Sequence, residues 1–339
     1  MKAFLTYSAY YLPDGRLTNE MINKDHPEWS VDKIASKTGI YTRPIAGDNQ
    51  FSSDLGVAAA QKLFMEEKIN PTEIDYLLFC TQSPDYFLPT TACIIQDKLG
   101  IKKSSGALDF NLGCSGYVYG LGLAKALIVS EQAKQVLLIT AETYSKFINK
   151  LDRGNKTLFG DGATASIIST KSKSDLSALI GDFVFYTDGS GYDKLIVKNG
   201  GMRGRNLDGR DIIDDDGQFL RNDNNLYMDG KSIFEFTSLV VPSLIEKLLT
   251  KNGFTNSDIS LFIFHQANEF MLHTVRKRCK IPEEKFFVFI RNCGNTVSST
   301  IPIALKEAQN QGMIKKGDRV LIAGFGVGLS AGISILEFI

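Results

Sequence analysis

One cysteine in the chain stands where nucleophilic catalysis requires it. Cys114 follows a short apolar run that ends near Asn111, and a helix-like stretch begins just after it. A sulfur at the N-terminus of a helix lies near free backbone N–H groups and the positive end of the helix dipole, so we expect a lowered pKa. Cys114 is therefore the candidate for a covalent nucleophile. Cys80, Cys93 and Cys279 lie within apolar-patterned elements, where packing is the simpler interpretation.

A histidine and an asparagine are the candidate partners of this sulfur. His265 is one of three histidines and ends an apolar run that begins at Leu261, so it is placed to face a cleft at the carboxyl end of a strand. Asn295 lies between a glycine and a helix-like stretch, where its side chain can cap the helix or donate a hydrogen bond to a developing oxyanion. Each residue, taken alone, also fits a purely structural role.

A glycine-rich segment supplies backbone N–H groups that no side chain screens. It reads Gly-Phe-Gly-Val-Gly over Gly324–Gly328 and follows an apolar run. Such N–H groups at the end of a strand are what an oxyanion hole requires. The segment does not match the dinucleotide-binding fingerprint, which needs a different glycine spacing followed by a helix.

Short apolar runs alternate with amphipathic stretches and must position these residues. Runs of this length, apolar on both faces, are typical of strands inside a sheet that helices cover on both sides. The predicted strands are Asp75–Cys80, Ala107–Asn111, Gln135–Thr140, Ala163–Ser169, Leu261–His265, Phe286–Ile290, Val320–Ala323 and Ala331–Phe338. The predicted helices are Ser53–Glu67, Gly116–Ser130, Ser232–Asn252 and Ser299–Gln311. The fold class is therefore layered α/β.

The two halves of the chain resemble each other. The segments Asn70–Cys80 and Thr255–His265 share a capped turn, an isoleucine and a strand, at an offset of 185 residues (265 − 80). Val136 and Val320 lie in a second matching pair, 184 residues apart (320 − 136). Two matches at nearly one offset indicate an internal duplication. We expect two similar α/β halves, residues 1–172 with the nucleophile and residues 173–339 with the His/Asn pair, and an active site between them.

Composition narrows the class of protein and of partner. The 339 residues include 38 Lys and Arg against 38 Asp and Glu, so no overall field attracts nucleic acid or an anionic membrane. Five cysteines, an odd number without any C-x-x-C pair, argue against a disulfide scaffold or a structural zinc site. Free thiols indicate a reducing compartment, and we expect the protein in the cytoplasm.

The sequence also predicts the structure of two further segments. Val320–Leu336 carries no charge, but four glycines interrupt it, so two buried strands joined by a glycine turn fit better than a membrane helix. Asn199–Asn225 is rich in Gly, Asn and Asp and is predicted to be a long surface loop. Its role stays open.

The motifs, in this order and spacing, resemble the β-ketoacyl-acyl carrier protein synthase III group of the thiolase superfamily. The resemblance runs nearly end to end. It rests on Thr38-Gly-Ile40, the Cys114 turn, Asp152-Arg-Gly154, Phe159-Gly-Asp-Gly-Ala163, His265-Gln-Ala-Asn268, Gly294-Asn-Thr296 and the C-terminal glycine segment.

This resemblance implies a thiolase-like duplicated five-layered α-β-α-β-α fold, a homodimer and a decarboxylative Claisen condensation. Cys114 would take the acyl group from an acyl-CoA primer, and malonyl-acyl carrier protein would lose CO2 to form the attacking enolate. His265 and Asn295 would hydrogen-bond the malonyl thioester oxygen, while the N–H groups of Cys114 and Val327 would form the oxyanion hole. No metal or redox cofactor is implied, and CoA enters only as a thioester substrate.

The resemblance also implies binding roles for further residues, and it leaves alternative functions open. It implies contacts to CoA or its pantetheine arm by Arg153, Asn268, Gly230 and Phe234, an acyl pocket at Leu88, and carrier-protein docking by Arg276, Lys277 and Arg278. Extra residues after Trp29 leave the role of that tryptophan unassigned. The sequence does not give the chain length of the primer or the identity of the donor. It also leaves open whether the enzyme initiates fatty-acid synthesis or serves a specialised pathway. The alternatives are acyl transfer without decarboxylation on the same fold, and a non-catalytic dimer partner that binds a carrier protein.

Overall fold

Two sets of five strands with the same order form the centre of the molecule. This computed structural model describes residues 1–339 except 173, 175, 206 and 207, and its main sheet has the order β14-β13-β15-β16-β8-β1-β7-β6-β4-β5. The N-terminal set comprises β1 (Phe4–Tyr11), β4 (Tyr76–Cys80), β5 (Gly106–Phe110), β6 (Gln135–Glu142) and β7 (Gly162–Ser169). The C-terminal set comprises β8 (Ala178–Thr187), β13 (Leu261–Phe264), β14 (Phe286–Phe287), β15 (Arg319–Gly326) and β16 (Ser330–Phe338).

The pairing pattern repeats between the two sets. β4 lies parallel between β5 and β6, and β13 lies parallel between β14 and β15. An antiparallel strand follows on the inner side of each set, β7 beside β6 and β16 beside β15. The sets meet where Phe4 and Leu5 of β1 pair with Leu179 and Ala178 of β8. The eight predicted strands are confirmed, and the strand order agrees with an internal duplication.

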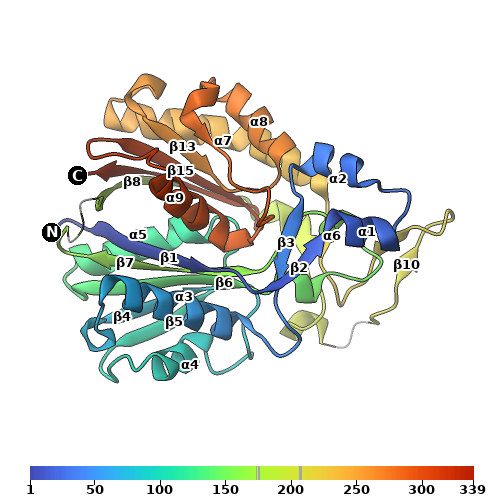
Figure 1. Cartoon of the computed structure of the whole chain (residues 1–339), viewed down its shortest axis with the longest axis horizontal. Coiled ribbons are helices and arrows are strands. Elements are labelled where there is room, and N and C mark those ends of the chain that lie inside the picture. Colours follow the sequence, from blue (N-terminus) through green and yellow to red (C-terminus); the bar gives the residue numbers. More distant parts are fainter. Residues whose placement is uncertain (173, 175, 206–207) are drawn as a thin grey trace.

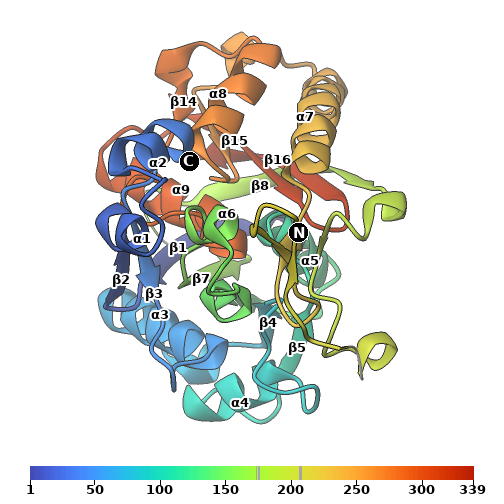
Figure 2. The same ribbon diagram turned by 90° about the vertical axis from the view of Figure 1, so that its right-hand side faces the viewer.

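Helices and sheets alternate as five layers (Figures 1 and 2). α3 (Ser52–Glu67) and α4 (Thr91–Lys98) cover the outer face of the N-terminal set, and α7 (Gly230–Asn252) and α8 (Glu269–Arg278) cover that of the C-terminal set. α5 (Gly116–Val129) and α9 (Thr300–Asn310) lie between the two sets. The predicted α-β-α-β-α fold is therefore confirmed.

The central layer is held by one apolar cluster drawn from both halves. Tyr117, Leu121, Ala124 and Ile128 of α5 recur every three or four residues and are fully buried, so this face of the helix packs against both sheets. The cluster also contains Ile301 and other residues of α9. Each half of the chain contributes one helix to this central layer, and that helix packs against the other half. The turn before α5 and the segment before α9 are therefore brought together.

Smaller elements gather at one end of the molecule, on the right of Figure 1. These are β2 (Gly15–Thr18), α1 (Asn19–Asp25), α2 (Val31–Thr38), β3 (Thr42–Ile45), α6 (Arg153–Lys156), β9 (Leu195–Ile196), β10 (Ile212–Ile213), β11 (Phe219–Arg221) and β12 (Tyr227–Met228). Short 3-10 turns complete the described elements: Pro71–Glu73, Tyr144–Phe147, Gly189–Gly191, Met202–Gly204, Asn256–Asp258, Glu283–Lys285 and Val297–Ser299.

The segment predicted to be a long loop contains some regular structure. β10 and β11 pair antiparallel as a hairpin within 199–225, so the prediction of an irregular loop there is only partly right. Asp214 makes the turn, because its backbone N–H bonds the Gln218 carbonyl and its carboxyl accepts the Asp216 and Gln218 N–H groups. Asn206 of this segment, and Lys173 at the start of the predicted C-terminal half, lie outside the described residues.

The uncharged C-terminal stretch forms two strands, as predicted. β15 and β16 pair antiparallel from Arg319↔Glu337 to Gly326↔Ser330, and the turn between them holds Val327 and Gly328. Within the part of the chain that the structure describes, no helix is long and apolar enough to cross a membrane.

Candidate active site

Cys114 lies in the turn that joins β5 to α5. Its side chain is 5% exposed, two residues before the first residue of the helix. Ser115, the next residue, shares a hydrogen bond of 2.7 Å between its hydroxyl and that of Ser330 on β16. The turn is thus tied to the C-terminal glycine segment by a buried contact between the two halves.

The glycine segment packs directly on the cysteine. A Cβ atom at Gly326 would lie 2.9 Å from both Cβ and Sγ of Cys114, and one at Gly324 would lie 2.8 Å from the Cys114 carbonyl oxygen. Glycine is required at Gly324 because it lies against the backbone of Cys114 and Ser115, and at Gly326 because it lies against the Cys114 side chain. The backbone N–H groups of Val327 and of Cys114 itself act on the sulfur and lower the pKa of the thiol. These are the two groups predicted to form the oxyanion hole.

The sulfur of Cys114 keeps its proton in this environment. Burial raises the pKa of the thiol to about 12, and the carboxyl of Glu142 acts in the same direction. The N–H groups of Val327 and Cys114 lower that pKa, but by less than burial raises it. The expected lowering of the Cys114 pKa by the helix N-terminus is therefore wrong, and the thiol needs a base when it attacks.

His265 follows β13, and its tautomer is set by a threonine. Nδ1 lies 2.7 Å from the hydroxyl oxygen of Thr300, which donates its single proton to the Val297 carbonyl at 3.0 Å. The hydroxyl can then only accept from Nδ1, so the ring proton is on Nδ1 and Nε2 keeps its lone pair. Burial lowers the pKa of His265 to about 3, so the ring is neutral before any substrate binds.

Asn295 is oriented by the same short segment. Its Oδ1 accepts the backbone N–H of Val297 at 2.9 Å, which leaves the Nδ2 amide as the end that can donate elsewhere. Val297 has φ of 55°, a left-handed conformation that a β-branched residue rarely adopts. Its N–H thus holds Asn295 while its carbonyl holds Thr300, and through Thr300 the ring of His265. Strained backbone of this kind is characteristic of functional sites.

One cavity brings the three side chains together. Cys114, His265 and Asn295 all line a hollow of about 160 Å³ between the two halves. Two residues expected along the pantetheine arm, Asn268 and Gly230, line it as well. The remaining lining is mostly apolar: Leu158, Phe159, Leu195, Met228, Ile233, Ala267, Met271, Phe325 and Gly326. Apolar walls around a few convergent polar groups are typical of a substrate site.

Two other expected site residues do not line this cavity. The ring of Phe234 stacks on that of Phe270 with centroids 5.7 Å apart, and its neighbour Ile233 faces the cavity instead. Leu88 is 83% exposed and lies in the loop between β4 and α4. Within a single copy of the chain, Leu88 therefore contributes to no wall of the catalytic cavity.

Arg153, the expected CoA contact, lies at the end of the molecule that carries the small elements. Its guanidinium donates to Glu28 at 2.6 Å and also to Gln218 of the hairpin segment. The guanidinium carbon is 5.8 Å from the ring centre of Trp29. The structure thus places the tryptophan that the sequence left unplaced. The ammonium groups of Lys33 and Lys37 lie over the same ring, at 5.4 and 5.6 Å.

The basic run at the end of α8 is only partly available to a partner. Arg276 is buried and donates to the Ile281 carbonyl at 3.0 Å and to Glu283 at 3.1 Å. Its assignment to carrier-protein docking is therefore wrong, because its charge is used to close the helix C-terminus. Lys277 and Arg278 are exposed.

Sequence reasoning missed the residues that support the catalytic set. Glu142, the last residue of β6, is fully buried and accepts the Gln82 N–H at 3.1 Å and the hydroxyls of Ser83 at 2.8 Å and Ser298 at 3.2 Å. For Glu142, the sequence does contain a signal, a carboxyl that directly extends an apolar run. For Thr300 the sequence contains no signal, because threonine is common at the start of a helix.

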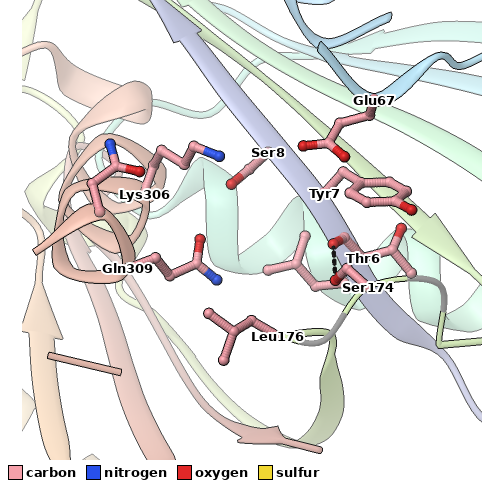
Figure 3. Close-up of a pocket in the computed structure, with 10 residues that line it drawn as sticks. Thr6, Tyr7, Ser8, Glu67, Ser174, Leu176, Lys306 and Gln309 are labelled. Atoms are coloured by element: carbon pink, nitrogen blue, oxygen red, sulfur yellow. Dashed lines mark hydrogen bonds between the residues drawn. The ribbon is translucent and has the colours of Figure 1, made fainter. Parts of the chain in front are cut away.

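Another hollow, between β1 and α9, lies away from Cys114, His265 and Asn295. Figure 3 shows it between β1 and α9, with Lys306 and Gln309 on one side and Glu67 and Tyr7 on the other. No cysteine or histidine is among the residues that line it. Cys114 lines the cavity between the halves and is not among the residues of this hollow.

Two family models match the chain. The model described as 3-oxoacyl-[acyl-carrier-protein (ACP)] synthase III matches residues 108–189, and the model of its C-terminal part matches residues 249–338. Among curated proteins, the β-ketoacyl-[acyl-carrier-protein] synthase III of Clostridium perfringens (strain SM101 / Type A) is 39% identical over 327 residues, which cover 96% of each chain. That of Clostridium novyi (strain NT) is 35% identical and covers 97% of this chain and 96% of its own.

Solved structures give the same result. A crystal structure of a 3-oxoacyl-(acyl-carrier-protein) synthase III superposes with a TM-score of 0.95 at 44% identity and covers all of both chains. The β-ketoacyl-[acyl carrier protein] synthase III of Thermus thermophilus has a TM-score of 0.85 at 32% identity, with 98% of each chain covered. The priming β-ketosynthase of the R1128 polyketide pathway has a TM-score of 0.83 at 26% identity, covering 99% of this chain and 96% of its own.

Proposed function

The chain belongs to the 3-oxoacyl-[acyl-carrier-protein] synthase III family, and from this premise we propose that it condenses an acyl-CoA primer with malonyl-acyl carrier protein. The observation that carries the proposal is the convergence of Cys114, His265 and Asn295 on one cavity, with the Val327 N–H at the sulfur. Fatty-acid synthesis and related lipid or secondary-metabolite pathways use such a step.

The first half-reaction transfers the acyl group to Cys114. Its sulfur attacks the thioester carbonyl of acyl-CoA, the bond from that carbonyl to the CoA sulfur breaks, and the CoA thiolate takes a proton from solvent. Nε2 of His265, which holds a lone pair, receives the thiol proton. The N–H groups of Cys114 and Val327 hold the oxyanion while the carbonyl carbon is tetrahedral.

The second half-reaction forms the carbon–carbon bond. The malonyl group loses CO2, and the electron pair of the broken bond becomes an enolate whose oxygen accepts from Nδ2 of Asn295 and from the proton now on Nε2 of His265. The enolate carbon attacks the Cys114 thioester, and the β-ketoacyl product leaves on the carrier protein. The sulfur departs as a thiolate and recovers its proton from His265.

The partners follow from the same proposal. Arg153 and Trp29 at the small-element end would meet the nucleotide of CoA, and Asn268 and Gly230 the pantetheine arm. Lys277 and Arg278 would meet the acidic carrier protein. We place the enzyme in the cytoplasm as a homodimer, because all five cysteines are free and three consecutive apolar side chains, Tyr86 to Leu88, are exposed.

Release of CO2 tests the proposal against its alternatives. The protein is incubated with acyl-CoA and malonyl-acyl carrier protein labelled in the carboxyl that is lost, and labelled CO2 and β-ketoacyl-carrier protein are measured together. The proposal requires equal amounts of both and none with Cys114→Ala. Acyl transfer to another acceptor without CO2 would point to the non-decarboxylating acyltransferase, and binding of the carrier protein without turnover to the non-catalytic partner.

A further inference from the structure

A second cavity adjoins the glycine segment at Val327. It has a volume of about 260 Å³, and Val327 and Leu195 belong to its lining. Leu195 also lines the catalytic cavity, and Gly113, the residue before Cys114, packs against Val327 and Gln82 of this cavity, so the two hollows adjoin near the sulfur. An acyl group on Cys114 has this second cavity next to it.

The walls of this second cavity differ in character. One side is apolar and consists of Phe147, Leu195, Ile196, Val197 and Leu226. The other side carries three polar side chains, those of Gln82, Asn111 and Tyr144. We call these three the polar wall. The wall reaches the residue before Cys114, since a Cβ at Gly113 would clash with Oε1 of Gln82.

The polar wall is held in place from several directions. Tyr144 donates its hydroxyl proton to Oε1 of Gln82 at 2.7 Å, and Nε2 of Gln82 donates to Oδ1 of Asn111 at 3.1 Å. Both oxygens of the buried Glu142 accept the backbone N–H of Gln82 at 3.1 Å. A wall fixed in this way does not need to rearrange when a ligand binds.

Donors remain free on this wall. Nε2 of Gln82 has two protons and uses one on Asn111, and within the described part of the chain the Asn111 amide nitrogen has no hydrogen-bond partner. Asn111 is exposed, but Gln82 is half-buried, and a plain alkyl chain in the cavity would cover its free N–H and leave it unsatisfied, which is unfavourable. An acyl chain with an oxygen on this side would accept from that N–H, and its carbon atoms would lie on the apolar wall.

An acyl group on Cys114 would extend into this cavity, and we propose that the polar wall there selects an acyl group with a hydroxyl or carbonyl oxygen near its third carbon over the plain alkyl chain. We choose the third carbon for the test because Gln82 of the wall packs against Gly113, the residue before Cys114. The inference rests on the proposed function, which supplies the acyl group on Cys114, and it adds the substrate class.

The test compares matched thioesters. Butyryl-CoA and the two enantiomers of 3-hydroxybutyryl-CoA are incubated separately with the full chain, and the rate of mass increase on Cys114 is measured. One 3-hydroxybutyryl enantiomer should acylate Cys114 at least about tenfold faster than butyryl. Gln82→Leu should make the three thioesters react at similar rates, and Gln132→Leu, on an exposed turn, should retain the preference.

Each other outcome has a definite meaning. If butyryl reacts as fast as both hydroxylated thioesters, or faster, the inference is overturned while the proposed function stands. A preference that survives in both Gln82→Leu and Asn111→Leu would overturn the assignment to the polar wall, and the second variant covers a folding failure of the first. If no thioester labels Cys114, the proposed function itself fails.

Discussion

At the scale of single residues, the site is organised by Val297 and Thr300 as much as by the groups that would react. The Val297 N–H fixes Asn295, and its carbonyl fixes Thr300, which holds Nδ1 of His265. One strained residue thereby sets the amide of Asn295 as a donor and Nε2 of His265 as an acceptor.

Thr300→Val removes the acceptor for Nδ1–H and keeps the shape of the side chain. The condensation rate should fall roughly fivefold to tenfold, because one hydrogen bond contributes about 1 kcal/mol. The ¹⁵N chemical shifts of the His265 ring should show a change from the single Nδ1–H tautomer to a mixture. Thr300→Ser should restore both the rate and the tautomer, and an unchanged spectrum in Thr300→Val would refute the positioning role.

Glu142→Gln should change how stability depends on pH. Burial raises the pKa of Glu142 from 4.5 to about 8, so between these values the folded state keeps a proton that the unfolded state has lost. The free energy of unfolding therefore decreases as pH rises from about 4.5 to 8, with a contribution from Glu142 of a few kcal/mol.

Chemical denaturation at pH 5 and pH 8 measures this contribution. The loss of stability between the two values should be smaller in Glu142→Gln than in the wild type. Glu66→Gln, at an exposed position on α3, is the matched control and should leave the loss unchanged. An identical loss in Glu142→Gln and the wild type would show that Glu142 is ionised in the folded state.

The reacting residues could be predicted from the sequence, but their states could not. Cys114, His265 and Asn295 each stand at the boundary of an element, and together they match a family pattern. Burial depends on the whole fold and cannot be derived from residues that are neighbours in the sequence. The raised pKa of Cys114 and the buried hydrogen bond from Arg276 to the Ile281 carbonyl were therefore not predictable.

At the scale of elements, the glycine segment between β15 and β16 decides how closely backbone approaches the sulfur. Gly326→Ala places a Cβ 2.9 Å from Sγ of Cys114, so the segment must move away and take the Val327 N–H with it. Acylation of Cys114 should slow by at least about a hundredfold, as expected for a displacement near 1 Å. Gly189→Ala, where nothing lies within 4 Å of the new Cβ, should react at the wild-type rate. Equal acylation rates in the two variants would contradict the role of this segment.

The β10–β11 hairpin segment reaches the expected nucleotide end of the site. Gln218 accepts from Arg153, which also pairs with Glu28, so Gln218→Ala leaves the guanidinium with one partner fewer. The KM for acyl-CoA should increase severalfold with kcat unchanged, whereas Gln132→Ala should leave both constants unaltered. An unchanged KM in Gln218→Ala would show that the hairpin does not contribute to the CoA site.

The composition of this segment predicted a loop. The strand that contains Ile212 and Ile213 is too short to produce an apolar pattern in the sequence.

At the scale of the whole molecule, the duplication explains why one site can draw on both halves. The matching runs at offsets of 185 and 184 residues fall in β4 and β13 and in β6 and β15, which hold equivalent places in the strand order. The sequence therefore predicted the layers well. The contact of the two halves through α5 and α9 depends on side chains far apart in the chain, and no local pattern indicates it.

An exposed apolar loop predicts that two copies of the chain associate. Phe87 and Leu88 are 75% and 83% exposed in the single chain, which is unfavourable in water unless a partner covers them. Phe87→Asp should shift the protein from dimer to monomer in sedimentation velocity experiments. Met65→Asp, at a similarly exposed position on α3, should stay dimeric. A wild-type protein that sediments as a monomer would contradict the proposed homodimer.

The most direct test of the whole mechanism separates its two half-reactions in one protein. Asn295→Ala is incubated with acyl-CoA and then with carboxyl-labelled malonyl-acyl carrier protein, and the intact mass and the released CO2 are followed. We predict that Cys114 still gains the acyl mass, because the oxyanion N–H groups are intact, while CO2 release falls by about a hundredfold or more. Loss of acylation together with undiminished CO2 release would contradict the assignment of Cys114 to acyl transfer and of Asn295 to the enolate.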